Sequence, residues 1–237
     1  MSAARRPVAL ITGAGSGIGR AAARMFHERN FMLVLVGRTA EKLAETSRAI
    51  GAEDALVVTG DIADREFPHA CIDRSVERFG RLDVLVNNAG VAPLATIPHT
   101  DEATLDACFR VNTFGPALLI ARAWPTFVRQ RSGCVVNVST IGTSDPFAGF
   151  FAYAASKSAL DSFTRSIARE GRSAGITAYS VNPGAVETPL LRQNFDEAML
   201  PRSKTIPADD VARIIVGCAC GERPEDNGRT ILLPSGR

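Results

Sequence analysis

The sequence has no marked excess of charge of either sign. Its 27 Lys and Arg residues stand against 25 Asp and Glu residues, which gives a formal net charge of +2. A balanced chain does not favour nucleic acid or an anionic membrane as a partner. No apolar run is long enough to cross a bilayer, and the run at residues 8–11 is too short for the core of a signal peptide. We therefore expect a soluble protein of the cytoplasm.

Patterns typical of metal sites, disulfides and catalytic triads are also missing. The five cysteines are scattered and odd in number, which favours reduced, buried thiols. Cys218 and Cys220 have no second Cys or His pair at metal-ligand spacing, so core positions near a helix end are the better interpretation. The three histidines stand apart from any serine or carboxylate in a triad pattern. We expect no metal ion.

The chain instead shows a regular alternation of strand and helix patterns. With 237 residues, 46% of them hydrophobic, it can form the core of one large α/β domain. Short β-rich runs occupy residues 8–12, 32–36, 55–59, 84–86, 134–138, 177–181 and 230–233. Helical patterns occupy residues 20–29, 40–50, 68–79, 105–129, 150–170 and 209–217. This alternation predicts right-handed crossovers and one parallel sheet covered on both faces, in a single domain spanning 1–237.

The first strand leads through a glycine-rich loop into a helix. Glycines there let the backbone approach a pyrophosphate, and the helix N-terminus offers it unpaired N–H groups. The context, after a strand and before a helix, strengthens an otherwise weak pattern. It predicts a dinucleotide site, with an ordinary glycine-rich turn as the alternative. The residues concerned are Gly13, Ser16, Gly17, Ile18 and Gly19.

Arg38 follows the second strand. In a dinucleotide fold this position meets the adenosine ribose, where an acid would bind a free 2′-hydroxyl and an arginine suits a 2′-phosphate. Arg38 therefore predicts that NADP(H) is favoured over NAD(H), unless it is only a solvated loop residue. Asp61 follows the third strand, placed either to accept a hydrogen bond from an adenine amino group or to cap the next turn.

Tyr153 and Lys157 lie four residues apart in the helix predicted at 150–170. Residues at this spacing share a helix face. A phenol normally loses its proton near pH 10, and an adjacent ammonium lowers that pKa by favouring the phenolate. The pair is a candidate acid/base device, although any isolated pair of this kind is more often part of a solvated face.

Other polar residues stand at places where ligands bind in parallel sheets. Ser139 ends the fifth strand, and Asn87 begins the turn after the fourth. That turn also fits a purely structural role. Asn112 lies among apolar residues of the stretch 105–129 and needs a hydrogen-bond partner. Pro116 is expected to bend this stretch and expose a carbonyl near Asn112 to a bound water.

Taken in order, these motifs resemble the short-chain dehydrogenase/reductase family, in its single-domain NAD(P)-dependent branch. The resemblance covers nearly the whole chain, and its specificity comes from the order of the motifs. It rests on Thr12-Gly13, Gly17-Ile18-Gly19, Asp61, Asn87-Asn88-Ala89-Gly90, Asn112, Ser139, Tyr153, Lys157, Asn182-Pro183-Gly184 and Thr188.

The resemblance implies a Rossmann-type, doubly wound, seven-stranded parallel sheet in the order 3-2-1-4-5-6-7. It implies a catalytic tetrad of Asn112, Ser139, Tyr153 and Lys157, and assembly into homodimers or homotetramers through the long helices. It also implies cofactor contacts from Gly13, Ser16, Gly17, Ile18, Gly19, Arg38, Asp61, Ile62, Asn87, Ala89, Gly90, Tyr153, Lys157, Pro183, Gly184, Val186 and Thr188.

The chain departs from the family pattern at three points, of which one is a rather short segment after the sixth strand, which argues against a large closed lid. Many NADPH-preferring relatives carry a second basic residue where this chain has Ser16, so the NADP preference rests on Arg38 alone. The C-terminal residues 233–237 lack the usual glycine pair, which leaves the packing of the tail open.

The expected reaction is hydride transfer between NADP(H) and a ketone or secondary alcohol. Ser139 would bind the substrate oxygen, Tyr153 would pass the proton, and Lys157 would hold the ribose. The segment 186–207 is expected to be a mobile flap with an apolar underside, or alternatively a surface helix-turn segment. Candidate pocket residues are Ile141, Phe147, Phe150, Leu190, Leu191 and Phe195, which favour an apolar or acyl substrate.

Two alternatives stay open at this point. A non-catalytic dinucleotide sensor that regulates a partner protein would bind the cofactor without turnover, but such relatives tend to lose the tyrosine or the lysine. A sugar-nucleotide epimerase or dehydratase would carry a larger C-terminal domain and a different glycine spacing, and this chain has neither.

Overall fold

A seven-stranded parallel sheet forms the centre of the computed structural model, which describes residues 6–236. The strands are β1 (Val8–Thr12), β2 (Met32–Gly37), β3 (Leu56–Thr59), β4 (Val84–Asn87), β5 (Gly133–Val138), β6 (Ile176–Pro183) and β7 (Thr230–Leu233). Their order is β3-β2-β1-β4-β5-β6-β7, and each neighbouring pair is parallel. The predicted sheet and its strand order are therefore confirmed.

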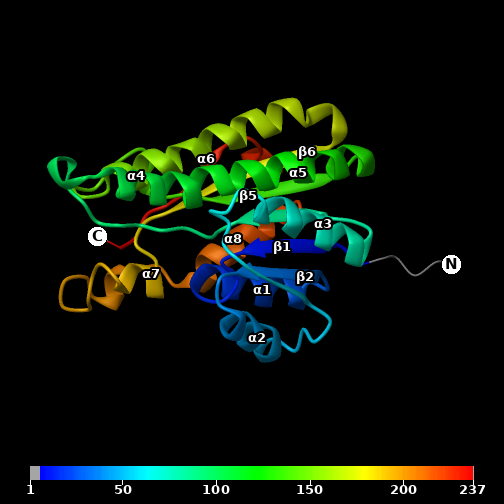
Figure 1. Cartoon of the computed structure of the whole chain (residues 1–237), viewed down its shortest axis with the longest axis horizontal. Coiled ribbons are helices and arrows are strands. Elements are labelled where there is room, and N and C mark those ends of the chain that lie inside the picture. Colours follow the sequence, from blue (N-terminus) through cyan, green and yellow to red (C-terminus); the bar gives the residue numbers. More distant parts are fainter. Residues whose placement is uncertain (1–5, 237) are drawn as a thin grey trace.

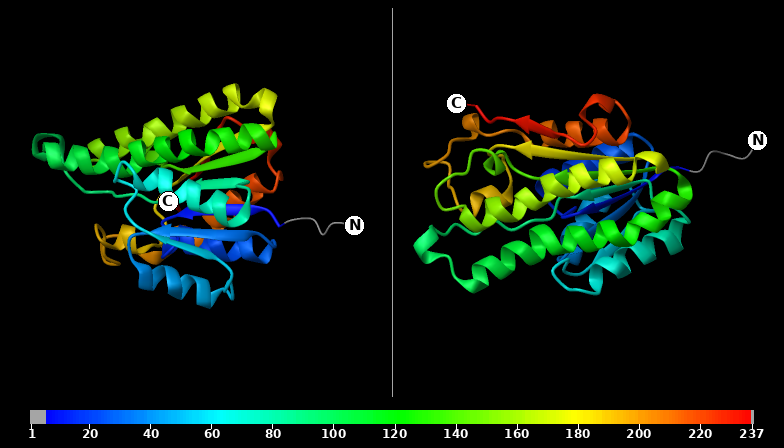
Figure 2. Two further views of the ribbon diagram at one scale, coloured as in Figure 1. Left: turned by 45° about the vertical axis from the view of Figure 1, so that its right-hand side comes forward. Right: turned by 90° about the horizontal axis from the view of Figure 1, so that it is seen from above.

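Helices cover both faces of this sheet (Figures 1 and 2). The helices are α1 (Gly17–Glu28), α2 (Ala40–Ala49), α3 (Phe67–Phe79), α4 (Glu102–Phe109), α5 (Gly115–Gln130), α6 (Phe151–Glu170), α7 (Pro189–Arg192) and α8 (Ala208–Ala219). One apolar cluster joins α1, α2 and α8 to the sheet, and a second joins α3, α5 and α6 to the opposite face. Because both faces are covered, β1 and β4 are buried along their whole length, as their apolar sequences require.

The stretch predicted as one helix at residues 105–129 is interrupted. A π-helical turn, Arg110–Phe114, separates α4 from α5. Pro116 lies in the first turn of α5, directly after the π turn. The Asn112 side chain accepts a hydrogen bond from Val91 N at 2.9 Å and donates to Val91 O at 2.9 Å. The single α-helix predicted for this stretch is therefore corrected to two α-helices joined by a π turn that contains Asn112, and the expected bend stays a prediction.

The segment 186–206, which we call the strap, folds over the ends of the strands. Its two ends pair through the Val186 and Ile206 bridge. Inside it, Arg192 forms an ion pair with Glu187 and donates hydrogen bonds to Phe195 O at 3.2 Å and Leu200 O at 2.8 Å. This internal bonding gives the segment, for which the sequence predicted no regular structure, a defined shape around the short helix α7.

No helix within residues 6–236 combines the length and the apolar character that spanning a membrane requires.

Candidate active site

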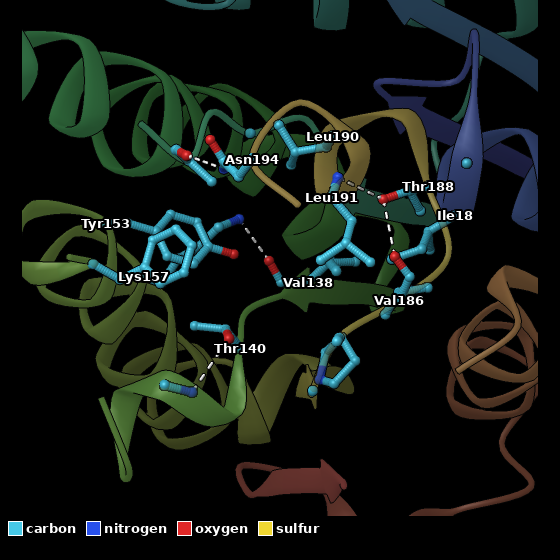
Figure 3. Close-up of a pocket in the computed structure, with 18 of the residues that line it drawn as sticks. Ile18, Val138, Thr140, Tyr153, Lys157, Val186, Thr188, Leu190, Leu191 and Asn194 are labelled. Carbon is cyan, nitrogen blue, oxygen red and sulfur yellow. Dashed lines mark hydrogen bonds between the residues drawn. The ribbon is translucent and has the colours of Figure 1, made fainter. Parts of the chain in front are cut away.

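A cavity of about 550 Å³ opens at the carboxyl ends of the central strands, beneath the strap. It brings together residues from the glycine loop, from the ends of β4, β5 and β6, and from α6 (Figure 3). Thirteen of the predicted site residues line it: Gly13, Ser16, Gly17, Ile18, Ala89, Gly90, Ser139, Tyr153, Lys157, Pro183, Gly184, Val186 and Thr188. Ligands of doubly wound sheets bind at this edge.

The glycines of this loop pack closely against neighbouring segments. A Cβ on Gly19 would lie 2.3 Å from Gly13 O, so Gly19 serves the close turn and does not line the cavity. Gly17 has φ +51°, and a Cβ on it would lie 2.9 Å from Thr188 Cγ2 in the strap. At the start of α1, Ser16 makes no side-chain capping bond. Unpaired backbone N–H groups at a helix N-terminus form a binding site for a pyrophosphate.

Three residues of the predicted tetrad, Ser139, Tyr153 and Lys157, line the cavity, and Asn112 lies behind it. Lys157 Nζ donates to Val138 O at 2.7 Å, a bond drawn in Figure 3. Ser139 Oγ donates to Lys157 O at 3.3 Å. A Cβ on Gly90 would lie 3.1 Å from Asn112 Oδ1 and 3.3 Å from Lys157 Nζ, so Asn112 and Lys157 approach each other beside Gly90.

Burial determines the protonation of Tyr153 and Lys157, the predicted acid/base pair. It raises the pKa of Tyr153 to about 12, although the neighbouring Thr140 hydroxyl favours the phenolate. Burial also lowers the pKa of Lys157 to about 8, against the opposing charge of Asp161. The net shift of the Tyr153 pKa is therefore upward, whereas the sequence predicted a lowered pKa beside Lys157. The reason is that the ammonium bonds to the Val138 carbonyl, and desolvation dominates at the phenol. At neutral pH, Tyr153 is therefore a phenol that can donate a proton.

Asp61 and Ile62 do not line this cavity, although both were predicted to contact the cofactor. Asp61 Oδ1 accepts from Ala63 N at 2.9 Å, which is the turn-capping alternative. Its other oxygen lies 3.9 Å from Arg38 Nη1. Ile62 is buried, and a Cβ on Gly115 would lie 2.6 Å from its carbonyl oxygen, so it packs beneath the start of α5.

Asn87 also points away from the cavity. It is buried, and its Nδ2 donates to Asn137 Oδ1 at 2.9 Å across the β4–β5 pair. Successive side chains of a strand point to opposite faces, so Asn88 takes the position that faces the glycine loop. Asn88 Nδ2 donates to Thr12 O at 2.8 Å, and Asn88 lines the cavity. The Asn87 side chain therefore does not line the cavity, and the predicted contact of Asn87 with the cofactor stays a prediction.

A second cavity, of about 450 Å³, continues the groove toward the ends of β2 and α2. Arg38 and Lys42 both line it. The two cavities share Gly13, Ser16, Gly90, Ala92, Pro189, Leu190 and Asn194. Asn194 Nδ2 donates to Ala92 O at 2.7 Å and so fastens the strap across the groove between the two cavities.

Several lining residues had no signal in the sequence. Lys42 reaches the second cavity from the first turn of α2, and Thr140 comes from the turn after Ser139. Ser235 belongs to the C-terminal tail, whose packing the sequence left open. A Cβ on Gly184 would lie 2.8 Å from Ser235 N, so the tail packs against the end of β6 and completes the wall.

Comparison with known proteins decides the family. The model of the short chain dehydrogenase family matches residues 7–198. The chain is a short-chain dehydrogenase/reductase. It is 36% identical to an uncharacterized oxidoreductase of Thermotoga maritima, over 97% of this chain and 96% of that protein. It is 32% identical to the 2-(R)-hydroxypropyl-CoM dehydrogenase of Xanthobacter autotrophicus, over 95% and 96% of the two chains.

Solved structures of this family have the same fold. A 3-ketoacyl-(acyl-carrier-protein) reductase from Brucella melitensis, solved as a complex with NADH, superposes with a TM-score of 0.90 at 28% identity, over 97% of both chains. Levodione reductase superposes with a TM-score of 0.88 at 27% identity, over 96% of both chains. This short-chain dehydrogenase/reductase is therefore an oxidoreductase that acts on CH–OH or C=O groups with a nicotinamide dinucleotide. The open N-terminus of α1 and the glycine loop beside it fit such a cofactor.

Proposed function

We propose that the protein transfers a hydride between NADP(H) and an apolar or acyl ketone, or the corresponding secondary alcohol. The observation that carries this proposal is the meeting of Ser139, Tyr153 and Lys157 in one cavity with the glycine loop. A dinucleotide on the loop and a carbonyl compound beside Tyr153 would share this space. Holding both reactants in one site removes much of the entropic barrier to their reaction.

Each polar residue has a distinct role in this reaction. A nicotinamide ring held beside these residues would supply or accept the hydride. In reduction, Ser139 donates a hydrogen bond to the substrate oxygen and Tyr153 delivers the proton to that oxygen. Lys157, protonated below a pKa of about 8, would hold the ribose hydroxyls, and its charge would favour the phenolate that Tyr153 leaves behind. Asn112 positions a water that links Lys157 to solvent.

The outer wall of the cavity supports an uncharged, apolar substrate. Its large side chains are Phe147, Phe150, Leu190, Leu191, Phe195, Met199 and Leu200. Among the described residues that line the cavity, Lys157 is the one charged side chain. The nearby guanidinium of Arg192 is engaged with Glu187. A substrate carboxylate or phosphate would therefore lack a partner cation here. An apolar or acyl ketone needs no such cation.

Arg38 and Lys42 together support the preference for NADP(H). Both side chains are exposed. The Arg38 contact with Asp61 is long, at 3.9 Å. Within residues 6–236, the Lys42 ammonium has no hydrogen bond or ion pair. The stem of Lys42 lies close to Gly15, since a Cβ there would be 3.0 Å from Lys42 Cβ. Lys42 thus supplies a second cation near the position where Ser16 replaces the basic residue of other relatives.

The cofactor preference is tested by removing each cation. Arg38→Ala should weaken NADPH binding about tenfold or more, since a charge-assisted hydrogen bond contributes about 1.5–3 kcal/mol. Lys42→Ala should weaken it by a smaller factor, and neither change should alter NADH affinity. Fluorescence titration of both cofactors measures this, with Lys204→Ala as a control at an exposed lysine that lines neither cavity. Equal losses for NADH and NADPH would discard the 2′-phosphate contact.

The reaction itself is tested with a panel of ketones and secondary alcohols, followed at the nicotinamide absorbance with both cofactors. We expect turnover of at least one uncharged, apolar compound. Cofactor binding without turnover anywhere on the panel would favour the non-catalytic sensor instead.

We also propose that the protein acts in the cytoplasm as a homodimer or homotetramer. Large apolar side chains are exposed along α4, the π turn, α5 and α6, at Leu105, Phe114, Val128 and Phe151. All five cysteines are free, as a reducing compartment would keep them. Light scattering of the purified protein should give two or four times the 25.2 kDa of one chain, and a monomer would reject the assembly. Cell fractionation tests the location.

A further inference from the structure

Two charged side chains stand out by their burial. In the part of the chain that the structure describes, Lys157 and Asp161 are the only Lys, Arg, Asp or Glu residues that are buried, at 3% and 8% exposure. They have opposite charge and lie four residues apart on α6. This spacing places them on one face of the helix, one turn apart.

Neither charge has an ion-pair partner within 4 Å among residues 6–236. Lys157 Nζ donates to the Val138 carbonyl. Asp161 Oδ1 accepts from Ser180 Oγ at 2.6 Å, and both carboxylate oxygens lie 3.2 Å from Asn182 Nδ2. Neutral groups thus satisfy the hydrogen bonding of both charges without cancelling either one. A buried charge is costly unless an opposite charge compensates it, and at one helical turn in a low-dielectric interior the two compensate each other.

Asp161 is also linked through Asn182 to the turn that carries Ser139 and Thr140. Asn182 Nδ2 lies 3.0 Å from Thr140 O and 3.1 Å from Thr143 Oγ1, as well as within reach of the carboxylate. Thr140 directly follows Ser139 and lines the cavity beside Tyr153. The carboxylate therefore fixes the amide that holds the turn on which the serine and threonine hydroxyls stand.

We infer that Asp161 is a positioning residue of the active site, whose buried carboxylate keeps Lys157 protonated and whose bond to Asn182 holds the Ser139–Thr140 turn. The inference rests on the proposed function only where it gives Asp161 a part in catalysis. The charge coupling itself is a property of the chain.

Other groups around Lys157 do not replace this charge. The titratable groups that face it are Tyr153 and Asp161 from α6 and Cys108 from α4. The π turn and β5 present the neutral Asn112 amide and the Val138 carbonyl. Burial raises the pKa of the Cys108 thiol and that of the Tyr153 phenol, so both are neutral near pH 7. Asp161 is left as the anion that opposes the desolvation of Lys157.

The composition of the chain makes a direct test possible. The sequence contains three lysines, Lys42, Lys157 and Lys204. Protein labelled with ¹³C at the lysine ε-carbon therefore gives three NMR signals, which Lys42→Arg and Lys204→Arg variants assign. In Asp161→Asn, the titration midpoint of the Lys157 signal should fall, with its proton affinity lowered about tenfold or more. Glu170→Gln, at the exposed end of the same helix, should leave the midpoint unchanged.

A second neutral variant separates charge from structure. Asp161→Ser retains an acceptor for Asn182 and should lower the Lys157 midpoint as well, while Asp161→Glu should restore it. A lower melting temperature with an unmoved Lys157 midpoint in the neutral variants would overturn the inference. So would failure of both neutral variants to fold, which would make Asp161 a residue of the fold alone. None of these readouts needs turnover, so they stand even if the proposed reaction fails.

Discussion

Tyr153→Phe is expected to lower turnover about a thousandfold and to leave the NADPH dissociation constant within about twofold of the original. The variant loses the proton donor, and general acid catalysis contributes about 10²- to 10⁴-fold. It keeps the ring, which packs against Phe150 at a centroid distance of 5.4 Å, so the cavity wall should stay in place. The measurements are kcat on the best ketone of the panel and a fluorescence titration with NADPH.

The chain offers a matched control for this substitution. Tyr179 is the one other tyrosine in the sequence, and it lies buried in β6, away from the cavity. Tyr179→Phe should change stability without a comparable effect on turnover. If Tyr153→Phe turned over ketone at the original rate, Tyr153 would not be the proton donor.

Lys157→Met is expected to impair binding and chemistry together, in contrast to Tyr153→Phe. We expect NADPH binding to weaken about tenfold to a hundredfold, because hydrogen bonds from a charged group contribute about 1.5–3 kcal/mol. We also expect turnover to fall at least a hundredfold, since the phenolate of Tyr153 would lose its stabilising charge. Titration and saturation kinetics on the same preparation separate the two losses. A variant that bound NADPH normally would remove Lys157 from the cofactor site.

The depressed pKa of Lys157 also predicts how stability depends on pH. The folded chain releases this proton near pH 8, whereas the unfolded chain holds it to the usual 10.5. The unfolded state thus binds more protons between these values, so the free energy of unfolding rises with pH. From pH 8 to pH 10, the original protein should gain about 2 kcal/mol relative to Lys157→Met in urea unfolding. A constant difference would mean that the lysine titrates normally in the folded state.

The sequence predicts the parts of this enzyme that depend on local patterns. Continuous apolar runs such as β1 had to be buried on both faces, and the side chains that end parallel strands had to meet at one edge. Ser139 and the glycine loop meet there for this reason. The helical spacing of Tyr153 and Lys157 placed both in the cavity in the same way.

The sequence does not predict the features of the site that depend on contacts between distant segments. Asn87 and Asn88 point to opposite faces of the sheet. The hydrogen bond to the buried Asn137 fixes the direction of the Asn87 side chain. The direction of the Tyr153 pKa follows from burial by the surrounding structure, which a pair of residues four apart does not reveal. Lys42 and Ser235 reach the groove only because α2 and the C-terminal tail fold back toward it.

The proposed function depends on hydride transfer from the cofactor to the ketone, and transfer of a deuterium label measures that step. NADPH carrying deuterium at the transferred position of nicotinamide C4 is incubated with the enzyme and its best ketone, and the alcohol is analysed by mass spectrometry. We expect one deuterium on the carbinol carbon of the product, and no labelled alcohol from the Tyr153→Phe variant over the same interval. An alcohol formed without deuterium from either face of the labelled cofactor, or no alcohol from any ketone of the panel, would contradict it.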